Sequence, residues 1–384
     1  MNRLLVVPVA AALLLAGCTA QPSNPTPARS TPPPDSAGVQ PAGTPTDVVT
    51  GLVSPWSIVT YEGSNGDPVT LVSQRDDGAV LILHPSSSGP KGSMTQQKLG
   101  DVPGVVHEGE GGLLGLAHLR DDQHSWLYAY ETTADDNRII RFPLDGDGAF
   151  GSGAEVVLDG LDKAGNHNGG RIAFGPDGML YATVGDAGDP QQAQDPASLN
   201  GKILRMTPTG GVPDDNPFPG SLVYSMGHRN PQGLTWDDKG QLWAAEFGQD
   251  TWDEFNKIEP RGNYGWPVIE GIAANPPDSP DTYIDPWVQW ATDDASPSGL
   301  TYVDGTFFLA GLGGERLWAI YVDEEHGTAD PVEYFTGQYG RIRDVAPGPD
   351  GSLWMLTDNT DGRGSPRDGD DRIVQVRLTP LVEG

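Results

Sequence analysis

Short apolar strands separated by polar turns recur along most of the chain. The clearest copies are FGPDGMLYATVGD from Phe174, WDDKGQLWAAEFG from Trp236 and APGPDGSLWMLTD from Ala346, and weaker copies begin at Ile58, Leu116 and Leu300. In each copy a pair such as Asp-Gly or Lys-Gly predicts a tight turn, and alternating apolar and polar residues predict a strand on either side. Six hairpins, about 45 to 65 residues apart, favour a β-propeller over a pair of β-sandwiches, which would not require six similar hairpins. We therefore expect an all-β fold, a six-bladed β-propeller.

Residues 1–17 follow a different pattern, an apolar run behind a charged start at Arg3, which is typical of a secretory signal peptide. They end in Leu15-Ala16-Gly17 directly before Cys18, which resembles the lipobox of bacterial lipoproteins. That resemblance implies a lipid on Cys18, while the alternative is an ordinary cleaved signal with an incidental cysteine. Since Cys18 is the sole cysteine in the sequence, no disulfide forms within one chain.

Residues 18–48 are rich in Pro, Ser, Thr and Ala and carry almost no large apolar side chains. Such a segment cannot bury enough surface to offset its ordering entropy, so we expect a disordered tether there and the propeller in residues 49–384. The expected location is outside the cell, lipid-anchored on the outer face of the bacterial cytoplasmic membrane or at the cell surface. Cys18 would be the sole membrane attachment.

The charge of the chain restricts its partners. There are 53 Asp and Glu against 23 Lys and Arg, a formal net charge of −30, which argues against nucleic acid and against binding to anionic lipid. A nucleophile elbow, a zinc-binding His-Glu-x-x-His and a dinucleotide-binding glycine motif are all missing from the sequence. In so acidic a protein, Lys or Arg side chains grouped in a pocket therefore point to a specific site rather than to general surface charge.

Polar segments just outside the predicted hairpins are the candidates for function, because propellers place their ligands over the central channel, at the loops between strands. Four stand out, at 107–119, 166–171, 224–236 and 246–267. The segment 166–171, NHNGGR, sets His167 between two asparagines where a loop meets a strand. An imidazole there suits acid–base chemistry near neutral pH, whereas an isolated loop histidine is more often a hydrogen-bonding cap.

Several of these segments resemble the soluble aldose (glucose/sorbosone-type) sugar dehydrogenases that use pyrroloquinoline quinone (PQQ). The resemblance rests on GEGGLLGLA, NHNGGRIAFGPDGMLYATVGDAGD, LNGKILRM, GHRNPQGL, DEFNKIEPRGNYGWP and GRIRDVAPGPDGSLW, in order between about residues 50 and 375. It implies a six-bladed propeller, in agreement with the repeats. It also implies oxidation of the C1 hydroxyl of an aldose to a lactone, with hydride transfer to PQQ and an external electron acceptor.

The resemblance also assigns roles to residues. His167 matches the general base, and Glu110, Arg229, Asn230, Arg341 and Arg343 match residues that bind the cofactor. PQQ is a tricarboxylate, so arginines suit it, and strand alternation would place 341 and 343 on one face. The alternative for the arginines is weak surface ion pairing.

Calcium is the second cofactor that the resemblance implies. The carbonyls of Gly248 and Gln249 match those that hold a Ca²⁺ ion against PQQ, where the ion would polarise the quinone. A structural Ca²⁺ in related proteins corresponds to the Glu254 carboxylate and the Tyr264 carbonyl. We expect a monomer, because the chain lacks the long insertions of dimeric family members.

One departure from the family supports a different function. Gly313 occupies the position of a Lys or Arg that contacts the quinone, and Arg316 lies three residues further on. The alternative is a non-catalytic propeller that binds a carbohydrate or a partner and has lost quinone binding. His167 and the matched arginines favour the enzyme, and a calcium-dependent lactonase would need a central carboxylate and amide cluster that the spacing does not provide.

Overall fold

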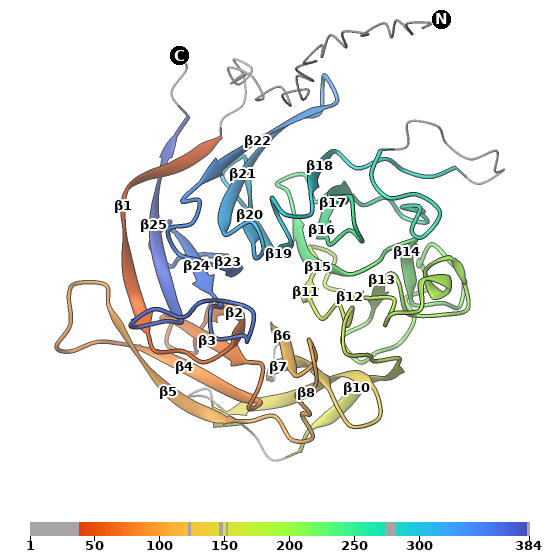
Figure 1. Cartoon of the computed structure of the whole chain (residues 1–384). Coiled ribbons are helices and arrows are strands. Elements are labelled where there is room, and N and C mark those ends of the chain that lie inside the picture. Colours follow the sequence, from red (N-terminus) through yellow and green to blue (C-terminus); the bar gives the residue numbers. More distant parts are fainter. Residues whose placement is uncertain (1–37, 122–123, 146–148, 151–152, 273–281, 382–384) are drawn as a thin grey trace, which may run out of the picture. The chain divides into compact units, whose positions relative to one another are not determined.

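In a computed structural model the chain is described at residues 38–121, 124–145, 149–150, 153–272 and 282–381. The signal peptide, Cys18 and most of the expected tether lie outside these residues. Within them, six sheets surround a common channel (Figure 1). Five sheets have four strands and one has a short fifth, which confirms the predicted six-bladed β-propeller.

The strands of the first three blades have the following bounds. They are β2 (Pro55–Glu62), β3 (Pro68–Gln74), β4 (Ala79–Pro85) and β5 (Met94–Asp101); β6 (Leu113–Arg120), β7 (Ser125–Thr132), β8 (Asn137–Asp145), β9 (Ala149–Phe150) and β10 (Glu155–Leu161); and β11 (Ile172–Phe174), β12 (Leu180–Val184), β13 (Lys202–Met206) and β14 (Val223–Met226). A short 3-10 helix, η1 (Pro190–Gln194), lies between β12 and β13.

The other three blades contain the remaining strands. They are β15 (Pro231–Trp236), β16 (Leu242–Glu246), β17 (Trp252–Lys257) and β18 (Val288–Ala291); β19 (Pro297–Val303), β20 (Thr306–Gly311), β21 (Arg316–Asp323) and β22 (Thr328–Tyr334); and β23 (Ile342–Pro347), β24 (Leu353–Thr357), β25 (Arg372–Pro380) and β1 (Val39–Thr50).

The innermost strand of each blade is the first strand of a predicted hairpin. These strands are β2, β6, β11, β15, β19 and β23, and each contacts the next around the ring. Each pairs antiparallel with the strand that follows it, so the start of the first strand and the end of the second lie at the same end of the channel. Loops at that end converge from all six blades.

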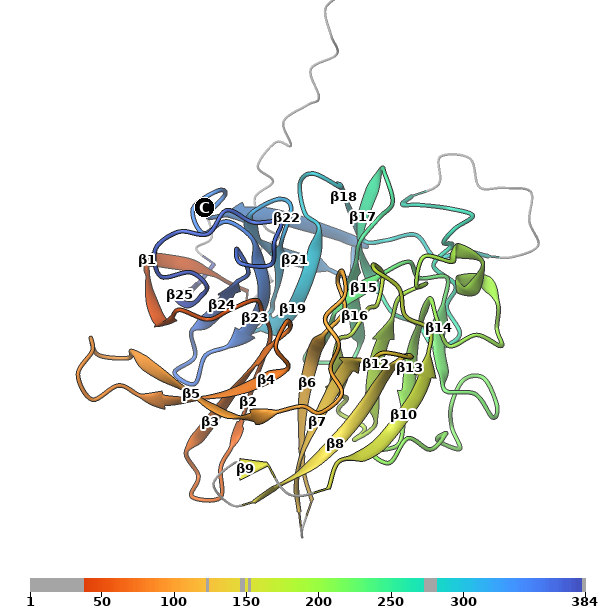
Figure 2. The same ribbon diagram turned by 60° about the horizontal axis from the view of Figure 1, so that its bottom comes forward.

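The last blade is closed by the N-terminal strand, and here the predicted boundary is wrong. β1 pairs antiparallel with β25 from Val39, opposite Pro380, to Thr50, opposite Arg372, at the outer edge of the blade (Figures 1 and 2). Residues 39–48 therefore belong to the propeller rather than to the tether. Their composition favours disorder, but the exposed edge of β25 supplies hydrogen-bonding partners for their backbone.

The core lies between neighbouring blades, and the second strands β12 and β16 are buried throughout. Trp243 and Phe255 stack with ring centroids 4.9 Å apart, and Phe307 of the next blade packs 5.2 Å from Phe255. Such pairs add roughly 0.5–1.5 kcal/mol beyond the area they bury. The aromatic residues that mark the sequence repeat thus hold one blade against the next.

Among the helices of the described residues, none has the length and apolar character needed to cross a membrane.

Candidate active site

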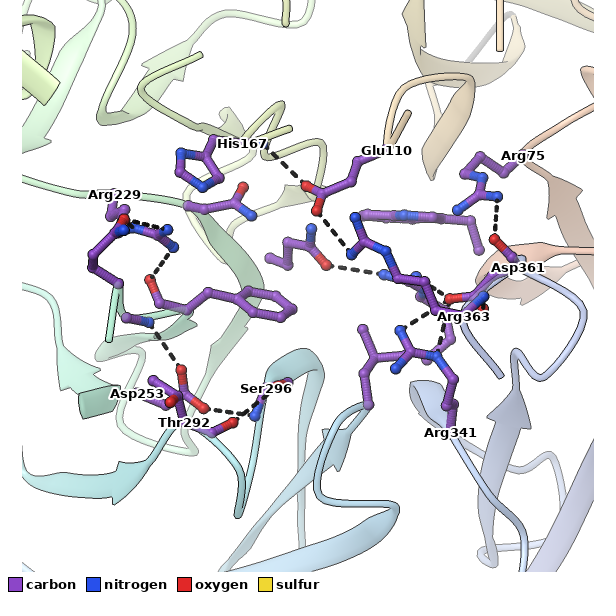
Figure 3. Close-up of a pocket in the computed structure, with 18 residues that line it drawn as sticks. Arg75, Glu110, His167, Arg229, Asp253, Thr292, Ser296, Arg341, Asp361 and Arg363 are labelled. Carbon is purple, nitrogen blue, oxygen red and sulfur yellow. Dashed lines mark hydrogen bonds and ion pairs between the residues drawn. The ribbon is translucent and has the colours of Figure 1, made fainter. Parts of the chain in front are cut away.

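A cavity of about 270 Å³ lies at the end of the channel where the innermost strands begin (Figure 3). Its walls come from the loops before these strands and from the loops after the second strands. Eight of the residues predicted from the sequence line it: Glu110, His167, Arg229, Asn230, Gly248, Gln249, Arg341 and Arg343. The chain thus brings together residues that lie up to 233 positions apart in the sequence.

His167 occupies a tight position in the loop before β11. Its φ is 57°, a left-handed conformation, and its main-chain N–H donates to Glu110 Oε2 at 3.0 Å. A Cβ added at Gly185 would lie 2.0 Å from the His167 carbonyl oxygen, so a glycine at 185 is required for this close approach. The neighbouring chain segments therefore fix the imidazole at the cavity wall.

Asp186 holds the imidazole in one orientation. Its Oδ1 lies 2.7 Å from His167 Nδ1, and its Oδ2 accepts a hydrogen bond from Trp266 Nε1 at 2.9 Å. Burial opposes the charge of Asp186, but the hydrogen bonds from His167, Gly188 and Trp266 outweigh it and hold the pKa of this carboxyl below its usual value. An ionised Asp186 assigns the proton of neutral His167 to Nδ1 and leaves a lone pair on Nε2.

Arg341 and Arg343 both line the cavity, Arg341 from just before β23 and Arg343 from within it. Arg341 pairs with Asp361 at 2.9 Å, and Arg343 pairs with Asp358 at 2.8 Å. Burial opposes the charge of Asp361, but Arg341 and other donors outweigh it and keep its pKa below the usual value. These arginines form buried ion pairs rather than the weak surface pairs of the alternative.

Arg229 faces the cavity from the opposite wall (Figure 3). It donates to neutral oxygens, Gln249 Oε1 at 2.7 Å and the Phe247 carbonyl at 3.3 Å. Burial lowers its pKa. The adjacent Asn230 is buried and accepts the Gly169 N–H at 3.0 Å, which ties this wall to the loop of His167.

Several residues of the cavity were not predicted from the sequence, among them Trp56, Arg75, Asp361 and Arg363. Asp186 was missed as well, although it lies in the matched segment VGDAGD. A carboxylate nineteen residues after a histidine is not a recognisable sequence motif. The contact between His167 and Asp186 forms because the β11–β12 hairpin brings these residues together.

Neither Gly313 nor Arg316 lines the cavity, although Leu312, next to Gly313, does. A Cβ at Gly313 would meet Ser296 Oγ at 2.4 Å, so a larger residue does not fit there without a shift. Arg316 pairs with Glu333 at 2.6 Å and does not line the cavity. It therefore does not replace the missing cation.

The turn at Gly248 and Gln249 is held by carboxylates. The Gly248 N–H donates to Asp253 Oδ1 at 2.9 Å, and the Gln249 N–H donates to Glu270 Oε1 at 2.6 Å. Burial raises the pKa of Asp253 to about 7. These contacts fix the main chain at the two residues whose carbonyls were predicted to bind calcium.

Glu254 and Tyr264 line a separate space of about 10 Å³, together with Glu246 and Glu270. The Glu254 carboxylate accepts the Gly271 N–H at 2.7 Å and Asn256 Nδ2 at 3.0 Å. Burial, and the nearby Glu246 carboxylate, raise the pKa of Glu254 to about 8. In the described part of the chain, no three or more His, Cys, Asp or Glu side chains are grouped so as to hold a metal ion.

Comparison with known proteins finds one family across most of the chain. A family model described as Glucose / Sorbosone dehydrogenase matches residues 52–366. An aldose sugar dehydrogenase of Escherichia coli is 31% identical over 342 residues, which cover 81% of this chain and 89% of that protein. An uncharacterized protein of Synechocystis is 32% identical over 354 residues, covering 82% of this chain and 84% of its own.

A solved structure extends the similarity to three dimensions. The PQQ-bound form of the aldose sugar dehydrogenase from Streptomyces coelicolor is 47% identical to this chain, with a TM-score of 0.79. The match covers 91% of this chain and 100% of that one.

Proposed function

The chain belongs to the glucose/sorbosone dehydrogenase family, and on that premise we propose that it is a PQQ-dependent aldose dehydrogenase. It would oxidise the C1 hydroxyl of an aldose to a lactone and pass the electrons to an external acceptor. The observation that carries the proposal is the meeting, in one cavity, of an imidazole oriented by a buried carboxylate and a group of arginines.

The chemistry of the cavity fits PQQ. Five arginines of the described residues line it, in a protein with a net charge of −30, and guanidinium groups bind carboxylates bidentately. Trp56 and Phe247 add aromatic surface for a planar ring system. The volume of about 270 Å³ lies near the lower end of small-molecule sites, which begin at roughly 300 Å³.

His167 is the proposed general base. With Nδ1–H donated to Asp186, Nε2 carries the lone pair, which faces Asn166 Nδ2 at 3.3 Å. Nε2 would exchange this contact for the C1 hydroxyl when it takes the proton. Glu110 holds the main chain of His167, so the base keeps its position while the proton moves. PQQ, when bound, supplies the acceptor for the hydride that leaves C1.

The proposal includes calcium at the carbonyls of Gly248 and Gln249. A hard dication prefers oxygen ligands, and the ion would act there as a Lewis acid. Glu254 and the Tyr264 carbonyl are proposed to hold a second, structural ion. Glu254 shares this space with the Glu246 and Glu270 carboxylates and with a single arginine among its described lining residues, Arg229. Burial and Glu246 raise the pKa of Glu254, and a bound dication would offset the negative charge gathered there.

We also propose that the mature protein is a monomer attached to the membrane through a lipid on Cys18. Mass spectrometry of the exported protein tests the attachment. A fragment from Cys18 that carries acyl chains supports it, whereas an unmodified N-terminus would show an ordinary cleaved signal.

The first test is a titration of the purified protein with PQQ and CaCl₂, followed by tryptophan fluorescence, because Trp56 lines the cavity. Dye reduction with a panel of aldoses then tests turnover. Calcium-dependent quenching together with sugar-driven reduction supports the proposal. Folded protein that binds no PQQ would instead favour the non-catalytic binding propeller.

His167→Ala tests the base. We expect PQQ binding within a few-fold of the wild type and a loss of kcat of roughly 10²–10⁴-fold, the usual contribution of general base catalysis. His326→Ala is the matched control, since the side chain of His326 is 69% exposed and lies outside the cavity. Full activity in His167→Ala would refute the assignment.

A further inference from the structure

The cavity arginines differ in how strongly the protein already neutralises them. Arg75, Arg341 and Arg343 each lie within 2.9 Å of a carboxylate oxygen, and their side chains are at most 12% exposed. Their partners Asp358 and Asp361 are themselves 1% exposed. These ion pairs offer hydrogen-bond donors to an entering anion but little net positive charge.

The other two cavity arginines are not neutralised by a buried ion pair. Arg229 contacts the neutral acceptors Gln249 and Phe247. Arg363 comes from the loop between β24 and β25 and donates to Glu110 Oε1 at 3.0 Å, with 59% of its side chain exposed. Figure 3 shows Arg363 and Arg229 on opposite sides of the cavity.

The backbone of the Arg363 loop is fixed even though the side chain is exposed. The N–H groups of Arg363 and Gly364 donate to Asp361 Oδ1 at 2.8 and 3.0 Å. A Cβ at Gly364 would lie 2.6 Å from the Cα of Asn359, so the turn is tightly packed. The guanidinium can therefore leave Glu110 without any change in the loop, and water competes for such exposed ion pairs.

We infer that Arg363 is an anion-binding residue at the mouth of the cavity and holds a carboxylate of PQQ. It supplies, from the last blade, the cation that Gly313 and Arg316 do not provide. This inference rests on the proposed function. In the bound state Arg363 exchanges its contact with Glu110 for one with the cofactor, while Glu110 Oε2 keeps the main chain of His167.

The test compares PQQ affinity in the wild type, Arg363→Gln and Arg363→Lys, by tryptophan quenching in the full chain. Arg363→Gln should weaken binding roughly tenfold or more, because a charge-assisted contact is lost. Arg363→Lys should recover most of the affinity, because it keeps the charge. The melting temperature should stay unchanged, which separates a ligand contact from a structural role.

Arg377→Gln is the matched control, since Arg377 is an exposed residue of β25 outside the cavity and its loss removes the same charge. It should bind PQQ like the wild type. Wild-type affinity in Arg363→Gln would overturn the inference and leave the proposed function standing. A wild-type protein that binds no PQQ would overturn both.

Discussion

At the scale of single residues, the central feature is the pairing of His167 with the buried Asp186. The carboxylate is 0% exposed and is shared between the imidazole, the Gly188 N–H and the Trp266 indole. Three donors on one carboxylate keep it ionised, and an ionised acceptor fixes which imidazole nitrogen carries the proton. Asp186 therefore determines which nitrogen of His167 can act as the base at the cavity wall.

Asp186→Asn tests this dependence. An amide in place of the carboxylate can present N–H to Nδ1 and stabilise the tautomer with its proton on Nε2, which cannot accept a proton from the sugar. We expect kcat to fall by roughly two orders of magnitude or more, with KM for the sugar and PQQ affinity changed by only a few-fold. Asp214→Asn, at an exposed loop position, is the control. Loss of PQQ binding in step with kcat would point to a disrupted fold instead.

The burial of Glu131 on β7 predicts how the stability of the fold depends on pH. It is 2% exposed, its Oε2 has no hydrogen-bond partner, and burial raises its pKa to about 7, against an ordinary value of 4.5. The folded state therefore binds more protons than the unfolded state between these values, so this residue contributes stability below pH 4.5 that is lost as pH rises to about 7.

Glu131→Gln should accordingly match the wild type in stability at about pH 4.5 and exceed it by up to about 3 kcal/mol at pH 8. Urea unfolding at the two pH values measures the difference. Glu62→Gln is the control, because Glu62 is exposed. A difference that does not change with pH would show that Glu131 is not buried as a neutral acid.

A site residue could be predicted from the sequence when it lies in a contiguous motif, but not when only a distant contact brings it to the site. His167, Arg229, Arg341 and Arg343 stand in contiguous segments of the resemblance, so all four were predicted and line the cavity. Arg363 was not, because its contact with Glu110 spans 253 positions and exists only once the ring of blades has closed. Local pattern carries no information about such a contact.

At the scale of elements, the six predicted hairpins all form. Turn residues and apolar–polar alternation determine a hairpin locally, within about a dozen residues, so the sequence suffices to predict it. β1 is the exception. Its sequence, VQPAGTPTDVVT, contains two prolines and three threonines and resembles a linker, yet it is extended along β25. Its conformation is imposed by an edge more than 320 residues away, from Arg372 onward.

Truncation tests the contribution of β1. A protein that begins at Gly38 should melt like the longer chain, whereas one that begins at Gly51 loses the closing strand and the buried Val48 and Val49. Burial of two valines contributes roughly 3–6 kcal/mol, so the shorter protein should melt far lower or fail to fold. Thermal unfolding followed by circular dichroism measures this. Equal melting temperatures would show that the last blade closes without β1.

At the scale of the whole molecule, the protein must admit an anion against its own charge. The net charge of −30 produces a repulsive field at long range, while the cations that bind the cofactor act only inside the cavity. Most of those cations are paired with carboxylates, so their positive potential does not extend far beyond the cavity. Capture of PQQ should thus be slowed at a distance and favoured on contact.

This division predicts that salt raises both the association and the dissociation rate constants of PQQ, for different reasons. Between about 0.01 M and about 0.15 M NaCl the Debye length falls from roughly 30 Å to about 8 Å, which screens the long-range repulsion first. The association rate constant for PQQ should rise roughly threefold or more, and the dissociation rate constant should rise too as the arginine contacts weaken. Stopped-flow tryptophan quenching at constant calcium measures both. An association rate that falls with salt would show that the arginines at the mouth, Arg363 among them, attract the cofactor from beyond the cavity and outweigh the acidic surface around them.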